Sequence, residues 1–164
     1  MAKKKATIAK KKVMLAASSA QHMPQVQLRD LRLFKSTCVH GVGRVPELKQ
    51  QITLTIGPKP DAPNTVMVSA EFALSGQAPD GQEGVRIEAT FSALYAVELL
   101  DEFTTDQVGA FLPSIALGNV WPYWREFVQS TTVRMGLPPL RVPLLQPNQI
   151  SGTKTIREGT RKRI

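Results

Sequence analysis

Residues 85–99, VRIEATFSALYAVEL, form the most regular stretch of the 164-residue chain. Apolar side chains take every second position, and Arg86, Glu88, Thr90 and Ser92 lie between them. The apolar positions are Val85, Ile87, Ala89, Phe91, Ala93, Tyr95 and Val97. Because side chains of a β-strand alternate between its two faces, this pattern predicts a long strand with one face in a core.

Two stretches before it, residues 48–56 and 65–74, show the same alternation and predict two more strands. The prolines of residues 57–64 cannot donate to a strand ladder, so they separate these two stretches. Asp80-Gly81, within residues 75–84, indicates a turn before the last strand. Strands that follow one another with short, turn-rich links favour an antiparallel meander.

A first strand is predicted over residues 25–35, but its alternation slips. Val26 and Leu28 share one parity, and Leu31 and Leu33 share the other. A β-bulge or strong twist near Asp30 explains the slip, and it predicts apolar side chains on both faces of this strand. The two glycines of residues 36–44 predict a loop after it.

The helical part follows the strands. Thr104 or Thr105 predicts the cap of a short helix that ends before Pro113 or near Gly118. Asn119 then predicts the cap of a second, longer helix that ends near residue 135, because Gly136 suits a helix C-terminus and Pro138-Pro139 stops any continuation. Residues 141–145 contain Pro143 and predict an extended arm. One sheet with one long helix predicts an α+β fold.

Four aromatic side chains crowd two turns of the second predicted helix. Trp124 and Phe127 fit a stripe at spacings of three and four and are predicted to lie in the core. Trp121 and Tyr123 fit either the core or an interface, because one sheet cannot cover aromatic side chains around most of a helix. The helix and the first strand together indicate oligomerisation, binding of apolar segments, or both.

Charge divides the chain into three parts. Residues 1–12 hold six lysines and no acidic residue, and residues 153–164 hold five basic residues and one glutamate. Between them lie 10 basic and 12 acidic residues, a net charge of −2. We therefore predict basic, disordered tails at residues 1–24 and 151–164 around one domain at 25–150. The tails are either solvated ends or arms for nucleic acid, ribosome or anionic lipid.

Composition excludes several classes of protein. A single cysteine, Cys38, cannot form an internal disulfide or a multi-cysteine metal site, and neither His22 nor His40 has a partner at metal-ligand spacing. The chain has no phosphate-binding loop, no nucleophile elbow and no apolar run long enough to span a membrane. The apolar run at residues 13–17 is shorter than that of a secretion signal. We expect a cytoplasmic non-enzyme without cofactor or metal.

Four short motifs, in the right order, resemble the SecB protein-export chaperones. Residues 122–126, PYWRE, resemble the run that enters the long helix of that family, and residues 135–140, MGLPPL, resemble the run that leaves it. Residues 30–33, DLRL, resemble its first-strand motif, with Leu33 where phenylalanine is usual. Residues 46–49, PELK, resemble the start of its second strand. The resemblance covers residues 25–145.

The resemblance implies a four-stranded antiparallel sheet with a long helix packed on one face. It also implies a homotetramer, built as a dimer of dimers, in which first strands pair across each dimer and helices pack between dimers. Such a protein is an ATP-independent holdase that keeps unfolded clients in apolar grooves. The implied client-binding residues are Val26, Leu28, Leu31, Leu33, Phe34, Trp121 and Trp124. The implied oligomer-interface residues are Leu31, Leu33, Tyr123, Phe127, Val128 and Thr131.

The sequence leaves three kinds of partner open: unfolded preproteins together with the translocation motor, a dedicated client, and nucleic acid or the ribosome. Export members of the family deliver unfolded preproteins and present an acidic surface to the translocation motor, whereas this body is nearly neutral. Pro143, Pro147, Gly152 and Gly159 also interrupt the region where the family has a second helix. A dedicated client, such as an antitoxin that needs protection from aggregation, suits this divergent sequence equally well. The alternative function is nucleic-acid or ribosome binding through the basic tails.

Overall fold

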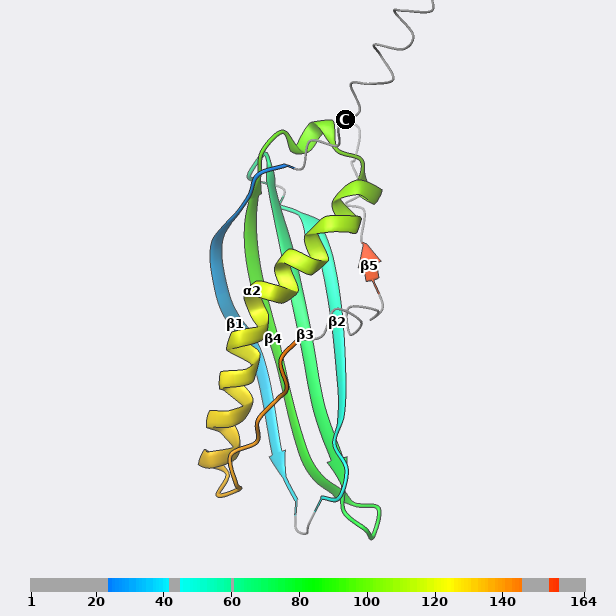
Figure 1. The fold of residues 1–164 in the computed structure, drawn as a ribbon, viewed down its shortest axis with the longest axis vertical. Helices are drawn as coiled ribbons and strands as arrows, with labels where there is room; N and C mark the ends of the chain where they lie inside the picture. Colours follow the sequence, from blue (N-terminus) through cyan, green and yellow to red (C-terminus); the bar gives the residue numbers. More distant parts are fainter. Residues whose placement is uncertain (1–23, 42–44, 60, 146–153, 157–164) are drawn as a thin grey trace, which may run out of the picture.

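Four long strands form an antiparallel sheet in the computed structural model, which describes residues 24–41, 45–59, 61–145 and 154–156. The strands are β1 (Val26–His40), β2 (Lys49–Pro58), β3 (Thr65–Gln77) and β4 (Glu83–Val97), and three residues form β5 (Lys154–Ile156). A short 3₁₀ helix, η1 (Leu100–Glu102), leads into the long helix α2 (Thr105–Arg134). The predicted α+β fold is confirmed, and α2 crosses one face of the sheet diagonally (Figure 1).

The order of the strands in the sheet is β1-β4-β3-β2-β5. The meander predicted from alternation is present as β2, β3 and β4. Strand β1 pairs with β4 rather than with its sequence neighbour β2, and β5 adds a short parallel pairing to β2. Most of both predicted tails lies outside the described residues, so the division into three parts stays a prediction.

The bulge predicted near Asp30 is confirmed, but its consequence differs from the prediction. Val26 lies opposite Val97, and Leu31 lies opposite Ala93, with one extra residue on β1 between Leu28 and Asp30. The extra residue shifts the alternation of β1 by one position. Residues of opposite parity on the two sides of the bulge therefore point the same way, and both apolar stretches of β1 face the helix side of the sheet. The predicted apolar character on both faces is therefore wrong.

Strand β1 is also longer than predicted. Residues 36–40 continue the ladder opposite residues 85–89 of β4, after a second register shift between Leu33 and Lys35. The loop predicted for residues 36–44 is therefore wrong over its first five positions. The long, regular β4 offers backbone partners there, and this pairing outweighs the weak strand pattern of β1.

A single 30-residue helix replaces the two predicted helices, and Pro113 and Pro122 lie inside it. The helix cap predicted at Asn119 is therefore wrong. Asn119 lies within α2, and its side-chain nitrogen donates to the Tyr95 hydroxyl at 3.3 Å. Several residues around the two prolines are fully buried against the sheet, and this packing holds the helix through both positions. They are Leu112, Ala116, Leu117 and Val120. No helix in the described ranges is long and apolar enough to cross a bilayer.

The helix begins with a capping box that confirms the prediction at Thr104. The Thr104 hydroxyl accepts from the Gln107 N–H at 3.3 Å, and Gln107 Oε1 accepts from the Thr104 N–H at 2.8 Å. We expect Thr104→Ala to lower the free energy of unfolding by about 1 kcal/mol, because one N–H at the helix end loses its acceptor. Urea denaturation measures this loss. Thr105→Ala, one position inside the helix, is the control, and an equal loss in both variants would contradict the cap.

Helix α2 ends as predicted at Gly136, whose φ of 75° is costly for residues with a Cβ. The Gly136 N–H donates to the Val133 carbonyl and the Leu137 N–H to the Thr132 carbonyl, the pattern of a Schellman motif. The chain then reverses, and residues 137–145, here called the arm, run back beside α2 in extended form (Figure 1).

The core lies between the sheet and α2, and an aromatic cluster fills its centre. Trp124 is fully buried and stacks on Phe72, with ring centroids 5.1 Å apart and an interplanar angle of 14°. Phe91 and Phe127 meet edge to face at 6.4 Å. These contacts tie the helix to β3 and β4, and they fix which side chains remain on the surface.

Candidate binding surface

Strand β1 carries three exposed apolar side chains and two that are half-buried. Leu28, Leu33 and Phe34 are 36%, 46% and 77% exposed, and Val26 and Leu31 are half-buried against the core. We call these five residues the β1 surface. Leu33 lies opposite Phe91 and therefore on the helix side, while Phe34 is the extra residue of the second bulge. The sequence named all five residues as client-binding, and all five lie on one strand; their role in binding stays a prediction.

The β1 surface adjoins an open sheet edge. Strand β1 is the first strand of the sheet, and within the described ranges only β4 pairs with it. Backbone N–H and C=O groups on its other edge can therefore receive an extended chain. Apolar side chains beside unpaired backbone suit a partner that is itself extended and apolar.

The two tryptophans assigned to the same surface lie in the core instead. Trp121 is 4% exposed and Trp124 is fully buried. The Trp121 indole N–H donates to the Pro143 carbonyl of the arm at 3.1 Å. Neither ring is accessible in this chain, so the structure does not place them with the β1 surface. The core position predicted for Trp124 agrees with its burial.

The proposed interface residues separate in the same way. Tyr123 is 54% exposed, and Phe127 is half-buried, whereas Val128 is fully buried and Thr131 is 9% exposed. The spacing of Val128 and Thr131 is that of the stripe facing the sheet, so an interface role for them is at odds with this structure. Val133 is 54% exposed and was not predicted to lie on the surface. No periodic signal distinguishes it from a core valine.

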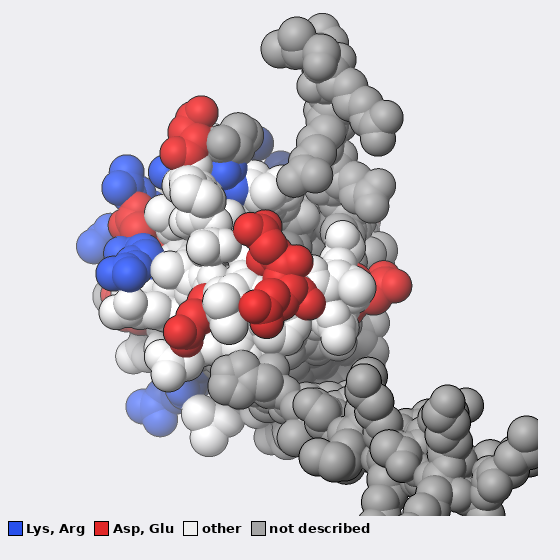
Figure 2. Space-filling view, turned by 90° about the horizontal axis from the view of Figure 1, so that it is seen from above, with Lys and Arg blue, Asp and Glu red and all other residues white. Residues whose placement is uncertain are grey.

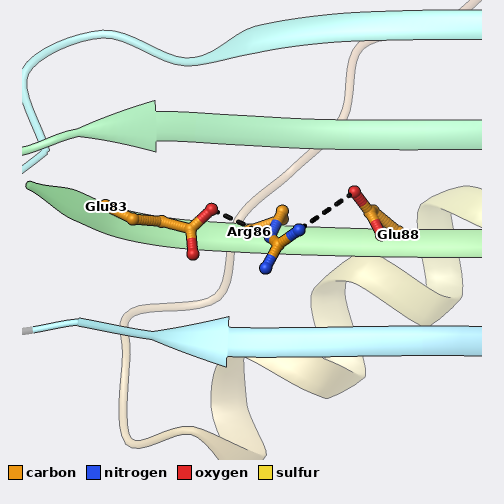
Figure 3. A network of polar contacts seen from close by, with 3 residues as sticks. All are labelled: Glu83, Arg86 and Glu88. Atoms are coloured by element: carbon orange, nitrogen blue, oxygen red, sulfur yellow. Dashed lines mark ion pairs between the residues drawn. The ribbon is translucent and has the colours of Figure 1, made fainter.

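The opposite face of the sheet is polar. Arg86 lies between Glu83 and Glu88, at 2.8 Å and 3.7 Å, on the strand that both glutamates share (Figure 3). Arg32 pairs with Asp30 on β1 at 2.5 Å. Partly exposed ion pairs of this kind add about 0–1 kcal/mol each to the free energy of unfolding. They make this face of the sheet polar but add little stability.

Acidic side chains gather at one end of the molecule. The segment joining β4 to α2 carries Glu98, Asp101 and Glu102, and the first turn of α2 carries Asp106; all four are exposed. Viewed from this end, acidic side chains occupy the middle and basic side chains lie to one side (Figure 2). The nearly neutral charge of the body therefore hides a local acidic region, which adjoins the start of β1, where the Glu98 N–H donates to the Gln25 carbonyl at 3.0 Å.

Cys38 lies on β1 rather than in the predicted loop, opposite Ile87 and on the helix side. Partial burial raises the pKa of the Cys38 thiol, and a hydrogen bond with the Thr131 side chain lowers it by less. Because the thiolate is the reactive form, the raised pKa argues against a reactive cysteine.

Replacing Thr131 by valine is expected to slow alkylation of Cys38 by iodoacetamide at pH 8. The substitution removes the hydrogen bond that lowers the pKa, so a smaller fraction of thiol is ionised. The midpoint of a rate-against-pH profile should move to higher pH. Thr37→Val, on the neighbouring residue opposite Glu88, is the matched control and should leave the midpoint in place. A midpoint at lower pH in Thr131→Val would contradict the role of this hydroxyl.

Comparison with known proteins adds to this geometry. No family model matches the chain. Two curated proteins named SecB-like chaperone, from the CDC 1551 and H37Rv strains of Mycobacterium tuberculosis, are each 29% identical, covering 74% of this chain and 78% of the relative.

A solved structure has the same fold. It is the Mycobacterium tuberculosis SecB-like chaperone Rv1957 in complex with a ChAD peptide from the HigA1 antitoxin Rv1956. It superposes with a TM-score of 0.66 at 24% identity, covering 82% of this chain and 95% of the other. The resemblance derived from the four sequence motifs is confirmed.

Proposed function

This chain is a divergent SecB-like protein, and on that premise we propose that it is an ATP-independent holdase for unfolded or partly folded clients. The observation that carries the proposal is the β1 surface, where exposed Leu28, Leu33 and Phe34 adjoin an open sheet edge. Apolar burial has no preferred direction, so such a surface accepts many sequences. Catalysis has no place in this function.

A dedicated client such as an antitoxin is the form of this function that we favour. The relative of known structure holds an antitoxin peptide, and the present chain shares its fold over most of both lengths. Delivery of preproteins to the translocation motor is the alternative. It is less favoured because the body carries only a slight excess of acidic residues.

We further propose that the protein is a cytoplasmic tetramer. Leu31 and Leu33 on β1 and Tyr123 and Phe127 on α2 retain exposed apolar area in the single chain, on the two elements that the family uses for assembly. Sedimentation equilibrium measures the mass directly. A monomer at micromolar concentration would remove this part of the proposal while leaving client binding open.

The test of the function is light scattering from a chemically unfolded client diluted into buffer, with and without the protein. We expect stoichiometric suppression of aggregation without nucleotide, and the same result with an antitoxin as client. Unchanged scattering with both clients would contradict the holdase function.

The lysines of residues 1–12 favour one other candidate, a nucleic-acid or ribosome-binding function. Its affinity should fall steeply as salt rises. Deleting residues 1–12 and 153–164 should then abolish binding to RNA, and unchanged affinity after the deletion would exclude the candidate.

A further inference from the structure

One short apolar run of the sequence has no role in the function proposed above. Residues 13–17, VMLAA, are too short for a secretion signal, and they belong to residues 1–23, outside the described part of the chain. Three lysines, residues 10–12, precede the run. It is the longest uninterrupted apolar run outside the described residues, so it has the most to gain from an apolar surface that covers it.

The described part of the chain starts directly beside exposed apolar side chains. It begins at Pro24, and the Gln25 carbonyl accepts from the Glu98 N–H at 3.0 Å, which fixes the start of β1 against the end of β4. Leu28 and Leu33, 36% and 46% exposed, follow Gln25 by 3 and 8 residues. No other strand of the described ranges pairs with the free edge of β1. A segment that reverses just before Gln25 therefore runs along both features.

The segment is long enough for the run to reach this part of β1. A strand rises about 3.3 Å per residue, so Leu28 and Leu33 lie about 10 Å and 27 Å from Gln25 along β1. Ala17 and Val13 precede Gln25 by 8 and 12 residues, which span up to about 27 Å and 40 Å when extended. Hairpin connections need only about two to five residues. With about four residues in a reversal, the run lies along β1 between Leu28 and Leu33.

The covalent link to β1 sets how strongly the run competes with client. A segment joined by a short linker is present at an effective concentration of the order of millimolar, so even weak intrinsic affinity occupies the surface. The lysines that precede the run then lie toward Arg32 and Lys35 of β1, and repulsion between like charges weakens the contact. A client that binds more tightly therefore displaces the run.

We propose that residues 13–17 dock on the β1 surface of their own chain when no client is bound, and that client must displace them. The N-terminal segment is then a built-in competitor that sets the apparent affinity of the site. This inference rests on the holdase function proposed above and names a regulation of the same surface.

The first test compares Leu15→Asp with Ile8→Asp in the full chain. Both replace an aliphatic side chain of the N-terminal segment by a carboxylate, but only Leu15 lies in the run. If the run is docked in about nine-tenths of the molecules, Leu15→Asp should raise the affinity for an unfolded fluorescent client by about tenfold. Ile8→Asp should leave that affinity unchanged.

The outcomes of this comparison separate the two proposals. No rise in Leu15→Asp, or an equal rise in both variants, overturns the docking of the run and leaves the holdase function in place. Failure of both the unmodified chain and Leu15→Asp to suppress client aggregation would instead overturn the holdase function.

A peptide added in trans tests the contact without client. The probe is a fluorescein-labelled peptide of residues 10–20, KKKVMLAASSA. We expect it to bind Leu15→Asp, whose own run is released, about tenfold more tightly than the unmodified chain. Adding Leu33→Glu should abolish this binding, and adding Met67→Glu, at nearly equal exposure on the opposite face of the sheet, should not. Equal binding to the unmodified chain and Leu15→Asp, or binding that Leu33→Glu leaves unchanged, overturns the docking site.

Photo-cross-linking identifies the surface that the run occupies. The full chain carries p-benzoylphenylalanine in place of Leu15, and its cross-links are mapped by mass spectrometry. We expect cross-links to residues 26–34 of the same chain, and their loss when unfolded client is added. A cross-linked dimer would assign the surface to the run of a second copy, and a cross-link outside β1 would place the run elsewhere. Either result overturns the proposal.

Discussion

Replacing Trp124 by alanine is expected to lower the free energy of unfolding by about 3–5 kcal/mol. The side chain is fully buried, stacks on Phe72 at 5.1 Å and lies 6.3 Å from the ring of Phe127. Its removal leaves a cavity between α2 and the sheet, because neither the helix nor β3 can move in without disturbing the other aromatic contacts. Urea denaturation, followed by circular dichroism, measures the loss.

Gln129→Ala is the matched control for Trp124→Ala. Gln129 is an exposed residue five positions further along the same helix, so its truncation should change stability by no more than about 0.5 kcal/mol. A loss for Trp124→Ala no larger than that of the control would mean that the indole ring is not part of the core. The sequence prediction that Trp124 contacts client directly would then return.

Strand β1 shows what alternation in sequence can and cannot predict. The slip of parity at Asp30 correctly located a bulge, because an extra residue is the simplest way to change parity within one strand. Which face the apolar residues then occupy depends on whether the partner strand continues in register. That partner is β4, whose residues lie 45 to 71 positions after the β1 residues they pair with, and no local pattern identifies it.

Helix α2 shows that a correct reading of local signals can still be overridden by packing. Pro122 and Asn119 are strong local signals for a helix start, and together they predict that a second helix begins at Asn119. In the folded chain Gly118, the residue whose carbonyl Pro122 cannot bond, is exposed and can bond to water instead. Val120 and Trp121 are buried on the other side of the helix. Burial against the sheet thus outweighs a single missing hydrogen bond.

The residues proposed for the candidate site fall into two groups: those on β1 are exposed or half-buried, and most of those on α2 are buried. Leu28 and Leu33 were named from the apolar pattern of the first strand, and Phe34 only from the resemblance; all three are exposed, but their role in binding stays a prediction. Trp121 and Val128 were assigned to surfaces because the sequence does not show which side of α2 meets the sheet. The arm covers Trp121, and its contacts with α2 depend on the chain reversal at Gly136.

Replacing Leu33 by glutamate is expected to weaken client binding by at least about tenfold. Burying a leucine contributes about 1.5–3 kcal/mol, and a carboxylate at the same contact must also lose water when an apolar client covers it. Leu33 is an exposed member of the β1 surface, on the helix side of the sheet, next to Phe34 in the strand. Suppression of client aggregation and the Kd for an unfolded fluorescent client measure the effect.

Met67→Glu is the matched control for Leu33→Glu. Met67 is 45% exposed, against 46% for Leu33, but it lies opposite Leu94 on the polar face of the sheet. Both substitutions place a carboxylate on an exposed strand position, so their effects on stability should be similar, at about 0.5–1 kcal/mol. Only Leu33→Glu should lose client, with the oligomer mass checked in both variants. Equal loss in the two variants would mean that binding follows general surface charge, and no loss in either would remove the β1 surface from the site.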